Sequence, residues 1–155
     1  MGSDTLIHNR KARFDFSILE TFEVGIVLKG TEVKSIRGHK AHLNDSFALI
    51  ERGEVILYNF HIDPYAFGNR SNHDPLRKRK LLLHKNEIQR LVGKLTQKRL
   101  TLVPLSIYLK RGRVKVEMAL AERKLKGDKR EDLKKKASDR EAQAAMKQRV
   151  RNVRN

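Results

Sequence analysis

Apolar and polar residues alternate along two N-terminal stretches, with apolar residues at positions 14, 16 and 18 and again at 22, 24, 26 and 28. A period of two is that of a β-strand with one buried face. The segments SFALI and EVILYNFHI come next, separated by Glu51-Arg52-Gly53, which is typical of a hairpin. Further on, LTLVPLSIYL and RVKVEMAL are joined through Arg111-Gly112. The pattern predicts about six strands with mostly short connections.

Two segments have helical periodicity instead. Val33 and Ile36 are three residues apart and precede Gly38, which predicts a short helix ending at this glycine. From Ile88, apolar residues recur at i, i+3, i+4 and i+7, which predicts an amphipathic helix over roughly residues 85–97.

The order of these elements predicts a fold class. Only one connection is long enough for a helical crossover, so hairpins and barrel corners fit better than a parallel sheet. The predicted fold is mainly β with helices: a small antiparallel β-barrel of oligonucleotide-binding type with flanking helices and a basic C-terminal tail. Within the barrel, the alternation shifts at Val103-Pro104. We expect a bulge or a strand edge there, because proline cannot donate to a sheet.

The segment 63–80, DPYAFGNRSNHDPLRKRK, holds two of the three prolines and predicts a long exposed loop. Arg70 lies in this loop, and the run from Arg77 to Lys80 ends it. Four consecutive cations repel one another unless something screens them, and phosphate contact would do so. A nuclear-import signal is the competing interpretation of the run.

The C-terminal tail contains no glycine or proline after Gly127. Asp128 followed by Glu131 has the spacing of a capping box, which predicts a helix starting near residue 128. Its few apolar residues form no stripe, so the helix has nothing to pack on and is marginal in water. We expect a tail that is disordered alone and helical when an anion neutralises it. A solubilising tail without a partner is equally compatible with the charge pattern.

Positive charge is spread over the whole chain. The net charge is +17 for 155 residues; residues 121–155 hold 13 Lys/Arg and 6 Asp/Glu, a net of +7, which leaves +10 on residues 1–120. Such a balance indicates a polyanionic partner. The apolar runs are too short to span a bilayer and no signal peptide is visible, so we expect no membrane partner. The chain has no cysteine, and we predict no metal, no cofactor and a cytoplasmic location.

Some residues have the chemistry for catalysis. His61 with Asp63, or His73 with Asp74, could form a metal or general-base pair in an RNA-processing enzyme. The segment Asn72–Pro75 is also typical of a turn, and the pattern favours this structural interpretation. No nucleophile lies beside a base in the sequence, and the prediction is a protein that is not an enzyme.

Exposed charges on the predicted strands and helix leave two interpretations open. Glu23 should face away from the core, where it could accept hydrogen bonds from base amino groups or merely balance Lys115. Lys34, Arg37 and Lys40 flank the short helix and could be a solvated surface or a phosphate-binding one.

Several stretches together resemble one known family. They are NRKAR (9–13), FEVGIVLKGTEVKSIR (22–37), KAHLNDSFALI (40–50), NHDPLRKRKLLLH (72–84), LTLVPLSIYLKRGRVKV (100–116) and DKR (128–130). In this order and spacing they resemble the small protein B family, the SsrA-binding proteins of bacterial trans-translation. The resemblance runs over nearly the whole chain.

The resemblance implies an oligonucleotide-binding barrel that holds the tRNA-like domain of tmRNA, and a tail that enters the empty mRNA channel of a stalled ribosome and contacts small-subunit RNA. The implied RNA-binding residues, with neighbours from the same stretches, are Asn9, Arg10, Glu23, Lys34, Arg37, Lys40, Leu82, His84 and Lys115. The implied ribosome-binding residues of the tail are Asp128, Lys129, Arg130, Lys134 and Lys135. Gly127 departs from the family, in which an aromatic residue or histidine commonly precedes DKR.

Three segments are expected: a flexible N-terminus over 1–8, an RNA-binding barrel over 9–121 and the tail over 122–155. The predicted function is that of a monomeric RNA-binding adaptor in ribosome rescue. The alternative is a structural ribonucleoprotein or ribosomal protein that binds RNA through its basic surface.

Overall fold

The computed structural model describes residues 4–68, 72–97 and 99–154. The chain divides into two compact units, Met1–Arg123 and Lys124–Asn155, and each is described by itself. Arg70, which the sequence placed among the loop cations, lies outside the described residues. No helix in the described ranges combines the length and apolar character needed to cross a membrane.

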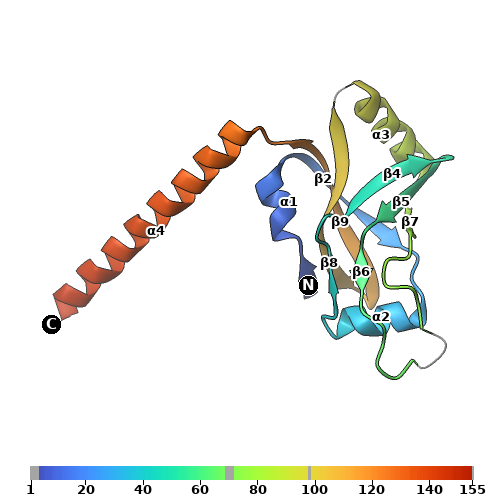
Figure 1. Ribbon diagram of the computed structural model, residues 1–155, viewed down its shortest axis with the longest axis horizontal. Coiled ribbons are helices and arrows are strands. Elements are labelled where there is room, and N and C mark those ends of the chain that lie inside the picture. Colours follow the sequence, from blue (N-terminus) through green and yellow to red (C-terminus); the bar gives the residue numbers. More distant parts are fainter. Residues whose placement is uncertain (1–3, 69–71, 98, 155) are drawn as a thin grey trace. The chain divides into compact units, whose positions relative to one another are not determined.

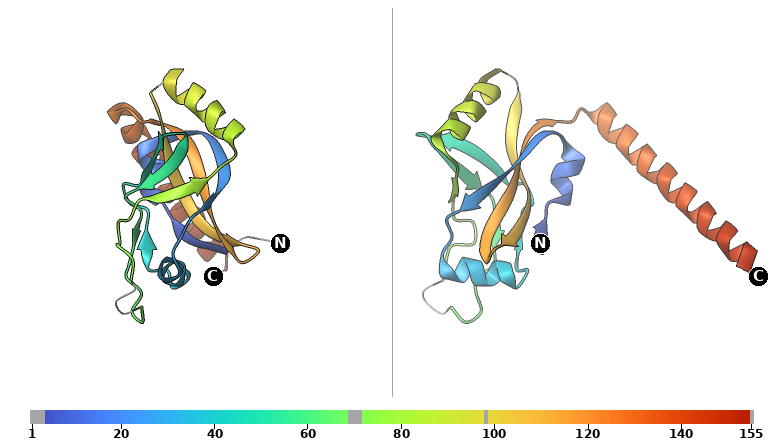
Figure 2. Two further views of the ribbon diagram at one scale, coloured as in Figure 1. Left: turned by 90° about the vertical axis from the view of Figure 1, so that its right-hand side faces the viewer. Right: turned by 180° about the vertical axis from the view of Figure 1, so that it is seen from behind.

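The first unit is built on one antiparallel sheet of seven strands that nearly closes into a ring (Figures 1 and 2). The strand order is β1-β8-β4-β5-β7-β2-β9, and β8 also pairs with β9. The ring therefore runs from β8 to β9, and β1 pairs with β8 outside it. The strands are β1 (Asp4–His8), β2 (Phe16–Ile26), β4 (Phe47–Glu51), β5 (Glu54–Tyr58), β7 (Arg79–Leu82), β8 (Leu100–Lys110) and β9 (Arg113–Arg123). A second, two-stranded sheet pairs β3 (Ala41–His42) with β6 (His61–Ile62).

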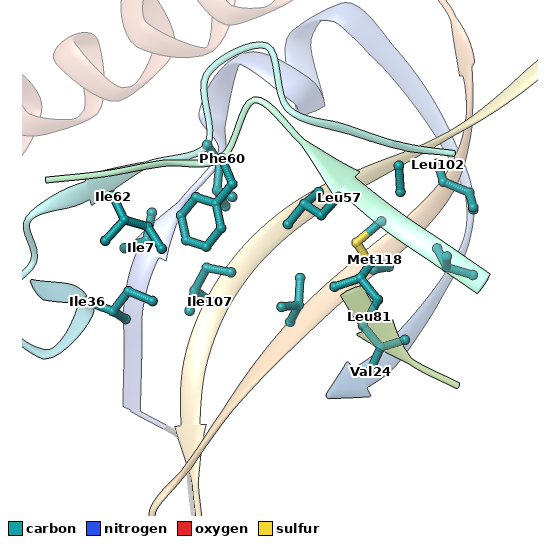
Figure 3. Packing of buried hydrophobic residues seen from close by; sticks show 14 of the residues in the cluster. Ile7, Val24, Ile36, Leu57, Phe60, Ile62, Leu81, Leu102, Ile107 and Met118 are labelled. Carbon is teal, nitrogen blue, oxygen red and sulfur yellow. The ribbon is translucent and has the colours of Figure 1, made fainter. Parts of the chain in front are cut away.

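The interior of the ring is a closely packed apolar core. Phe60, Leu57 and Ile107 are completely buried, and Figure 3 shows them directed toward one another with residues from several strands. On β9, Val116 and Met118 are buried in the core as the alternation predicted. Burying one such side chain stabilises the folded state by about 1.5–3 kcal/mol. The apolar residues that predicted these strands therefore also stabilise the ring.

Three helices accompany the ring: α1 (Arg10–Asp15), α2 (Gly30–Arg37) and α3 (Lys85–Gln97). The last two lie at opposite ends of the ring (Figures 1 and 2). The bounds of α3 agree with the predicted ones, and Gly38 is the C-cap of α2 as expected.

The helix α1 was not predicted and corrects the alternation read around Phe14. Asn9 caps it, because its side-chain oxygen accepts a hydrogen bond from the Ala12 N–H at 3.1 Å. The helix then covers the outer face of β8 and β9, where Ala12 packs with Val103 and Ala119. The apolar residues at positions 14, 16 and 18 therefore straddle a helix and a strand.

The described part of the N-terminus is also corrected. Residues 4–8 were expected to be flexible, but they form β1 and pair with β8 from Asp4↔Leu109 to His8↔Ser106. Ile7 is buried in the core. The pairing fixes the N-terminal strand to the sheet because it satisfies the backbone groups along one edge of β8.

The predicted hairpin turn and the predicted bulge are both confirmed. The β4–β5 hairpin turns at Arg52 and Gly53, whose φ angles are 50° and 76°. Such angles at both central positions are those of a type I′ turn. The register between β8 and β9 shifts between Pro104 and Ser106, which is the bulge expected at this proline.

The second unit is the helix α4 (Lys126–Arg154), which begins two residues before the predicted start. Asp128 lies in its first turn, where a carboxylate is favoured by the helix dipole. Lys124 contacts Asp132 across the start of the helix. The helical form is the one predicted for the bound tail, while disorder of the free tail in solution stays a prediction.

Candidate nucleic-acid interface

Glu23 on β2 is the centre of a charged hollow on the outer face of the sheet. The hollow is lined by Glu23, Lys110, Arg111, Arg113 and Lys115. The Tyr108 hydroxyl donates to the Glu23 carboxylate at 2.5 Å, and the Lys110 ammonium lies 3.3 Å from it. The hydrogen bond from Tyr108, the nearby Lys110 and the charge of Lys115 hold the pKa of Glu23 below its usual range, against the effect of partial burial. Glu23 is therefore an ionised, oriented acceptor among cations, which is more than a charge balancing Lys115.

A second hollow adjoins the first and is largely apolar. Gly25, Leu28, Val33 and Leu82 line it together with Lys115. Leu82 is about half exposed, at 51%, although it is a large apolar residue. A Cβ on Gly25 would lie 3.3 Å from the Leu82 side chain, so the glycine leaves room for the leucine. The structure thus brings three predicted residues, Glu23, Leu82 and Lys115, to adjoining hollows.

The α2 helix contributes the predicted cations Lys34 and Arg37, and Lys40 follows its C-cap Gly38; all three are exposed. Lys34 lies over the ring of Tyr65, with its ammonium 5.2 Å from the ring centroid. Val33 of the same helix lines the apolar hollow, so α2 connects that hollow with its own row of cations.

Asn9, which the resemblance implied as an RNA-binding residue, has partners within the protein. It is 4% exposed, and its amide donates to the backbone carbonyls of Pro104 at 2.7 Å and Leu43 at 3.3 Å. Asn9 therefore links α1 to β8, and its contact with RNA stays a prediction. Arg10, the next residue, is exposed and lines a small hollow beside Glu117.

His84 is exposed at the start of α3, where it lies 3.9 Å from Glu87. It is thus available to a ligand but is not part of either hollow. The tail residues Asp128, Arg130, Lys134 and Lys135 are exposed on α4, and Lys129 is partly buried.

The cation run from Arg77 to Lys80 does not form one screened surface. Arg79 is completely buried, donates to the Glu32 carboxylate and to the Phe60 carbonyl, and lies over the Phe60 ring. Arg77 donates to the same carboxylate at 2.6 Å. Acidic residues of the protein therefore pair with three of the four cations: Glu32 with Arg77 and Arg79, and Glu54 with Lys80.

Sequence reasoning missed Glu32 because it looked like an ordinary charge on a short helix. Its position three residues after Lys29 was the one local signal, since its carboxylate accepts from the Lys29 backbone N–H at 2.7 Å. The contact with Arg79 spans 47 residues and has no local signature.

The histidines considered for catalysis have structural partners. His73 is buried, with its ring nitrogens 2.9 Å from the Thr31 hydroxyl and 2.9 Å from the Ile62 carbonyl. His61 stacks on His42 and lies 3.3 Å from Asp63. The Thr31 hydroxyl beside His73 therefore belongs to a structural hydrogen-bond network around a buried ring. Within residues 4–68, 72–97 and 99–154 there is no metal-binding group of three or more His, Cys, Asp or Glu.

The barrel carries exposed cations on its surface, with apolar side chains between them. These features define a protein of the nucleic-acid-binding class. The sequence matches the family described as SmpB protein over residues 6–148. The chain belongs to this family, whose members are non-catalytic RNA-binding proteins.

Individual relatives agree with this membership. The chain is 57% identical to an SsrA-binding protein of Halothermothrix orenii, over 97% of this chain and 99% of the relative. It is 61% identical to an SsrA-binding protein of Thermosynechococcus vestitus, over 93% and 95% of the two chains. It is also similar to a solved structure described as "tmRNA-SmpB: a journey to the center of the bacterial ribosome", with 56% identity and a TM-score of 0.65 over 77% of this chain and 85% of the other.

Proposed function

We propose that this chain is an adaptor that binds the tRNA-like domain of tmRNA and delivers it to stalled ribosomes for trans-translation. The observation that carries the proposal is the grouping of Glu23, Leu82 and Lys115 around two adjoining hollows of a family member. They come from three different strands, β2, β7 and β9, and are far apart in the sequence. The proposed place of action is the cytoplasm, and the proposed active form is a monomer.

The chemistry of the two hollows fits folded RNA. Lys115 and Arg113 line both hollows and can each neutralise a phosphate. Glu23 can accept hydrogen bonds from base amino groups, and Leu82 can lie against a sugar or a base. Most of this recognition is of shape and backbone, as expected for a partner with a tRNA-like fold.

The barrel is proposed to be a variant of the oligonucleotide-binding type. The closed strand order β8-β4-β5-β7-β2-β9 supports a small antiparallel barrel with helices at its ends. An oligonucleotide-binding barrel of the usual kind has about five strands, so the assignment requires an additional strand in the ring.

The proposal is tested by removing one charge from the hollow and one from elsewhere. Lys115→Ala should weaken binding to the tRNA-like domain about 5- to 10-fold, because one phosphate contact is lost, and should reduce the salt dependence by about one counterion. The control is Lys147→Ala, which removes one positive charge from α4 instead. Its affinity for the tRNA-like domain should stay within twofold of that of the unmodified chain. The affinities are measured by fluorescence anisotropy of labelled RNA. Equal effects of the two substitutions would contradict the proposed surface.

A further inference from the structure

Phe67 is an aromatic residue that the protein leaves almost entirely in solvent. Its exposed fraction is 80%, so burial in its own protein contributes little to the free energy of folding. It lies in a tight turn that is closed by a hydrogen bond from the Gly68 N–H to the Tyr65 carbonyl at 3.0 Å. The Tyr65 and Phe67 rings pack edge to face, with centroids 5.6 Å apart. The turn thus presents a pair of aromatic rings, hereafter the Tyr65–Phe67 pair.

Hydrogen bonds fix the backbone of the turn that carries the two rings. The Asn72 amide accepts from the Tyr65 N–H at 2.9 Å and donates to the Tyr65 carbonyl at 2.7 Å. Gly68 packs against α2, where an added Cβ would lie 3.1 Å from the Thr31 methyl group. The rings are therefore positioned before any partner binds, which lowers the entropic cost of binding.

Positive charge lies beside the rings. Lys34 is over Tyr65, Arg37 is exposed at the end of the same helix, and Lys40 is exposed just beyond its C-cap. Glu32, the acidic residue of α2, is buried and neutralised by Arg77 and Arg79. The nearest carboxylates in sequence on the other side are Asp63, which is half exposed and lies 3.3 Å from His61, and the exposed Asp74. The helix beside the pair consequently presents cations, and its one carboxylate is turned inward.

We propose that the Tyr65–Phe67 pair is a stacking platform for an unpaired RNA base, with Lys34 beside it for the phosphate. Aromatic faces next to cations recognise single-stranded nucleotides in this way, since every base has a π-face. The inference rests on the proposed function only in taking RNA as the partner. It adds an RNA contact separate from the hollows around Glu23, Leu82 and Lys115.

The chain has no tryptophan, so Phe67→Trp introduces a single fluorescent reporter at the platform. The full chain with this substitution is titrated with the tRNA-like domain of tmRNA and, separately, with ribosomes. Stacking of a base should quench the tryptophan emission. Quenching by the tRNA-like domain assigns the base to tmRNA, and quenching by ribosomes alone assigns it to ribosomal RNA.

Affinity measurements with the quenching RNA complete the test. Phe67→Ala should weaken binding by about 5- to 150-fold, the range for loss of one stacked base. The matched control is Leu76→Ala, which removes a 55% exposed apolar side chain without a π-face and should bind within twofold of the unmodified chain.

The inference is overturned if neither RNA quenches Trp fluorescence, if Phe67→Ala binds within twofold, or if Leu76→Ala loses as much. These outcomes are separable from failure of the proposed function. The unmodified chain can still prefer the tRNA-like domain while Phe67 proves irrelevant. If the unmodified chain does not bind that domain, the adaptor proposal fails and the ribosome titration still decides the role of Phe67.

Discussion

Glu32 of α2 and Arg79 of β7 form an ion pair in which both side chains are completely buried. Arg77 joins them at the edge, and the Phe60 carbonyl accepts a further hydrogen bond from Arg79. A buried pair of this kind costs much desolvation, and it is tolerable only when nearly every donor is satisfied. The network ties α2, which carries the predicted RNA-binding cations Lys34 and Arg37, to the barrel wall.

Glu32→Gln should therefore lower the free energy of unfolding by about 3–5 kcal/mol, because Arg79 stays buried without a counter-charge. Urea denaturation at neutral pH measures the loss. Glu54→Gln is the control: Glu54 pairs with Lys80 at 3.0 Å with both side chains about half exposed, and its loss should cost at most about 1 kcal/mol. A cost below 1 kcal/mol for Glu32→Gln would show that the network does not hold α2.

The unmodified chain and Glu32→Gln should also differ in how their free energy of unfolding depends on pH. Burial raises the pKa of Glu32, but the hydrogen bonds from Arg77, the Lys29 backbone and Arg79 outweigh it, so the pKa lies below its usual value. A carboxyl with a lowered pKa in the folded state stabilises fully above its unfolded pKa of about 4.3. Its contribution is lost as the pH falls through the folded pKa. The difference between the unmodified chain and Glu32→Gln should consequently shrink in acid and stay constant from about pH 6 to 8.

At the scale of elements, α4 is the one long element whose side chains are almost all exposed. Its 29 residues have no apolar stripe, so packing within its own unit cannot account for its stability. Lys134, Lys135 and Lys136 are consecutive, and phosphate groups along an RNA channel would relieve their repulsion. The helix thus has the properties of an element that acts on a partner.

Truncation before Asp128 should leave affinity for the tRNA-like domain within about twofold, because the proposed RNA-binding hollows belong to the barrel unit. It should abolish tagging of nascent chains on stalled ribosomes in a reconstituted translation reaction. Replacing Asp128, Lys129 and Arg130 by alanine should have the same divided effect in a chain of full length. Comparable losses of affinity and tagging would contradict the division of labour between the two units.

Elements with strong periodicity could be predicted from the sequence, and short elements could not. The regular apolar spacing of α3 gave its bounds, and Pro104 marked the bulge in β8. By contrast, α1 has six residues and packs on β8 and β9 through Ala12, while β1 pairs with an edge of β8. Both depend on contacts distant in sequence, as does the burial of Arg79.

Only part of the candidate site could be predicted from the periodicity of the sequence. The cations of α2 and the outward direction of Glu23 followed from periodicity, but the grouping of Glu23 with Leu82 and Lys115 required the fold or the resemblance. The burial of Asn9 could not be predicted, because a resemblance names a position without saying whether its side chain is exposed. The Tyr65–Phe67 pair had no periodic signal, since it lies in an irregular loop.

At the scale of the whole molecule, the net charge of +17 raises the question of specificity. Such a charge attracts any polyanion, and that attraction alone falls steeply as salt rises. Specific recognition requires contacts that depend on the shape of one RNA, which is the role proposed for the hollows around Glu23. Charge would then bring the RNA to the surface, and the hollows would select it.

The most direct test of this account is a binding titration at several salt concentrations with three RNAs: the tRNA-like domain of tmRNA, an ordinary tRNA and an unrelated hairpin of equal length. The account predicts a preference for the tRNA-like domain that persists at moderate salt, while binding of the hairpin collapses. Equal binding of all three RNAs, lost together as salt rises, would contradict it and would leave net charge as the only basis of RNA binding.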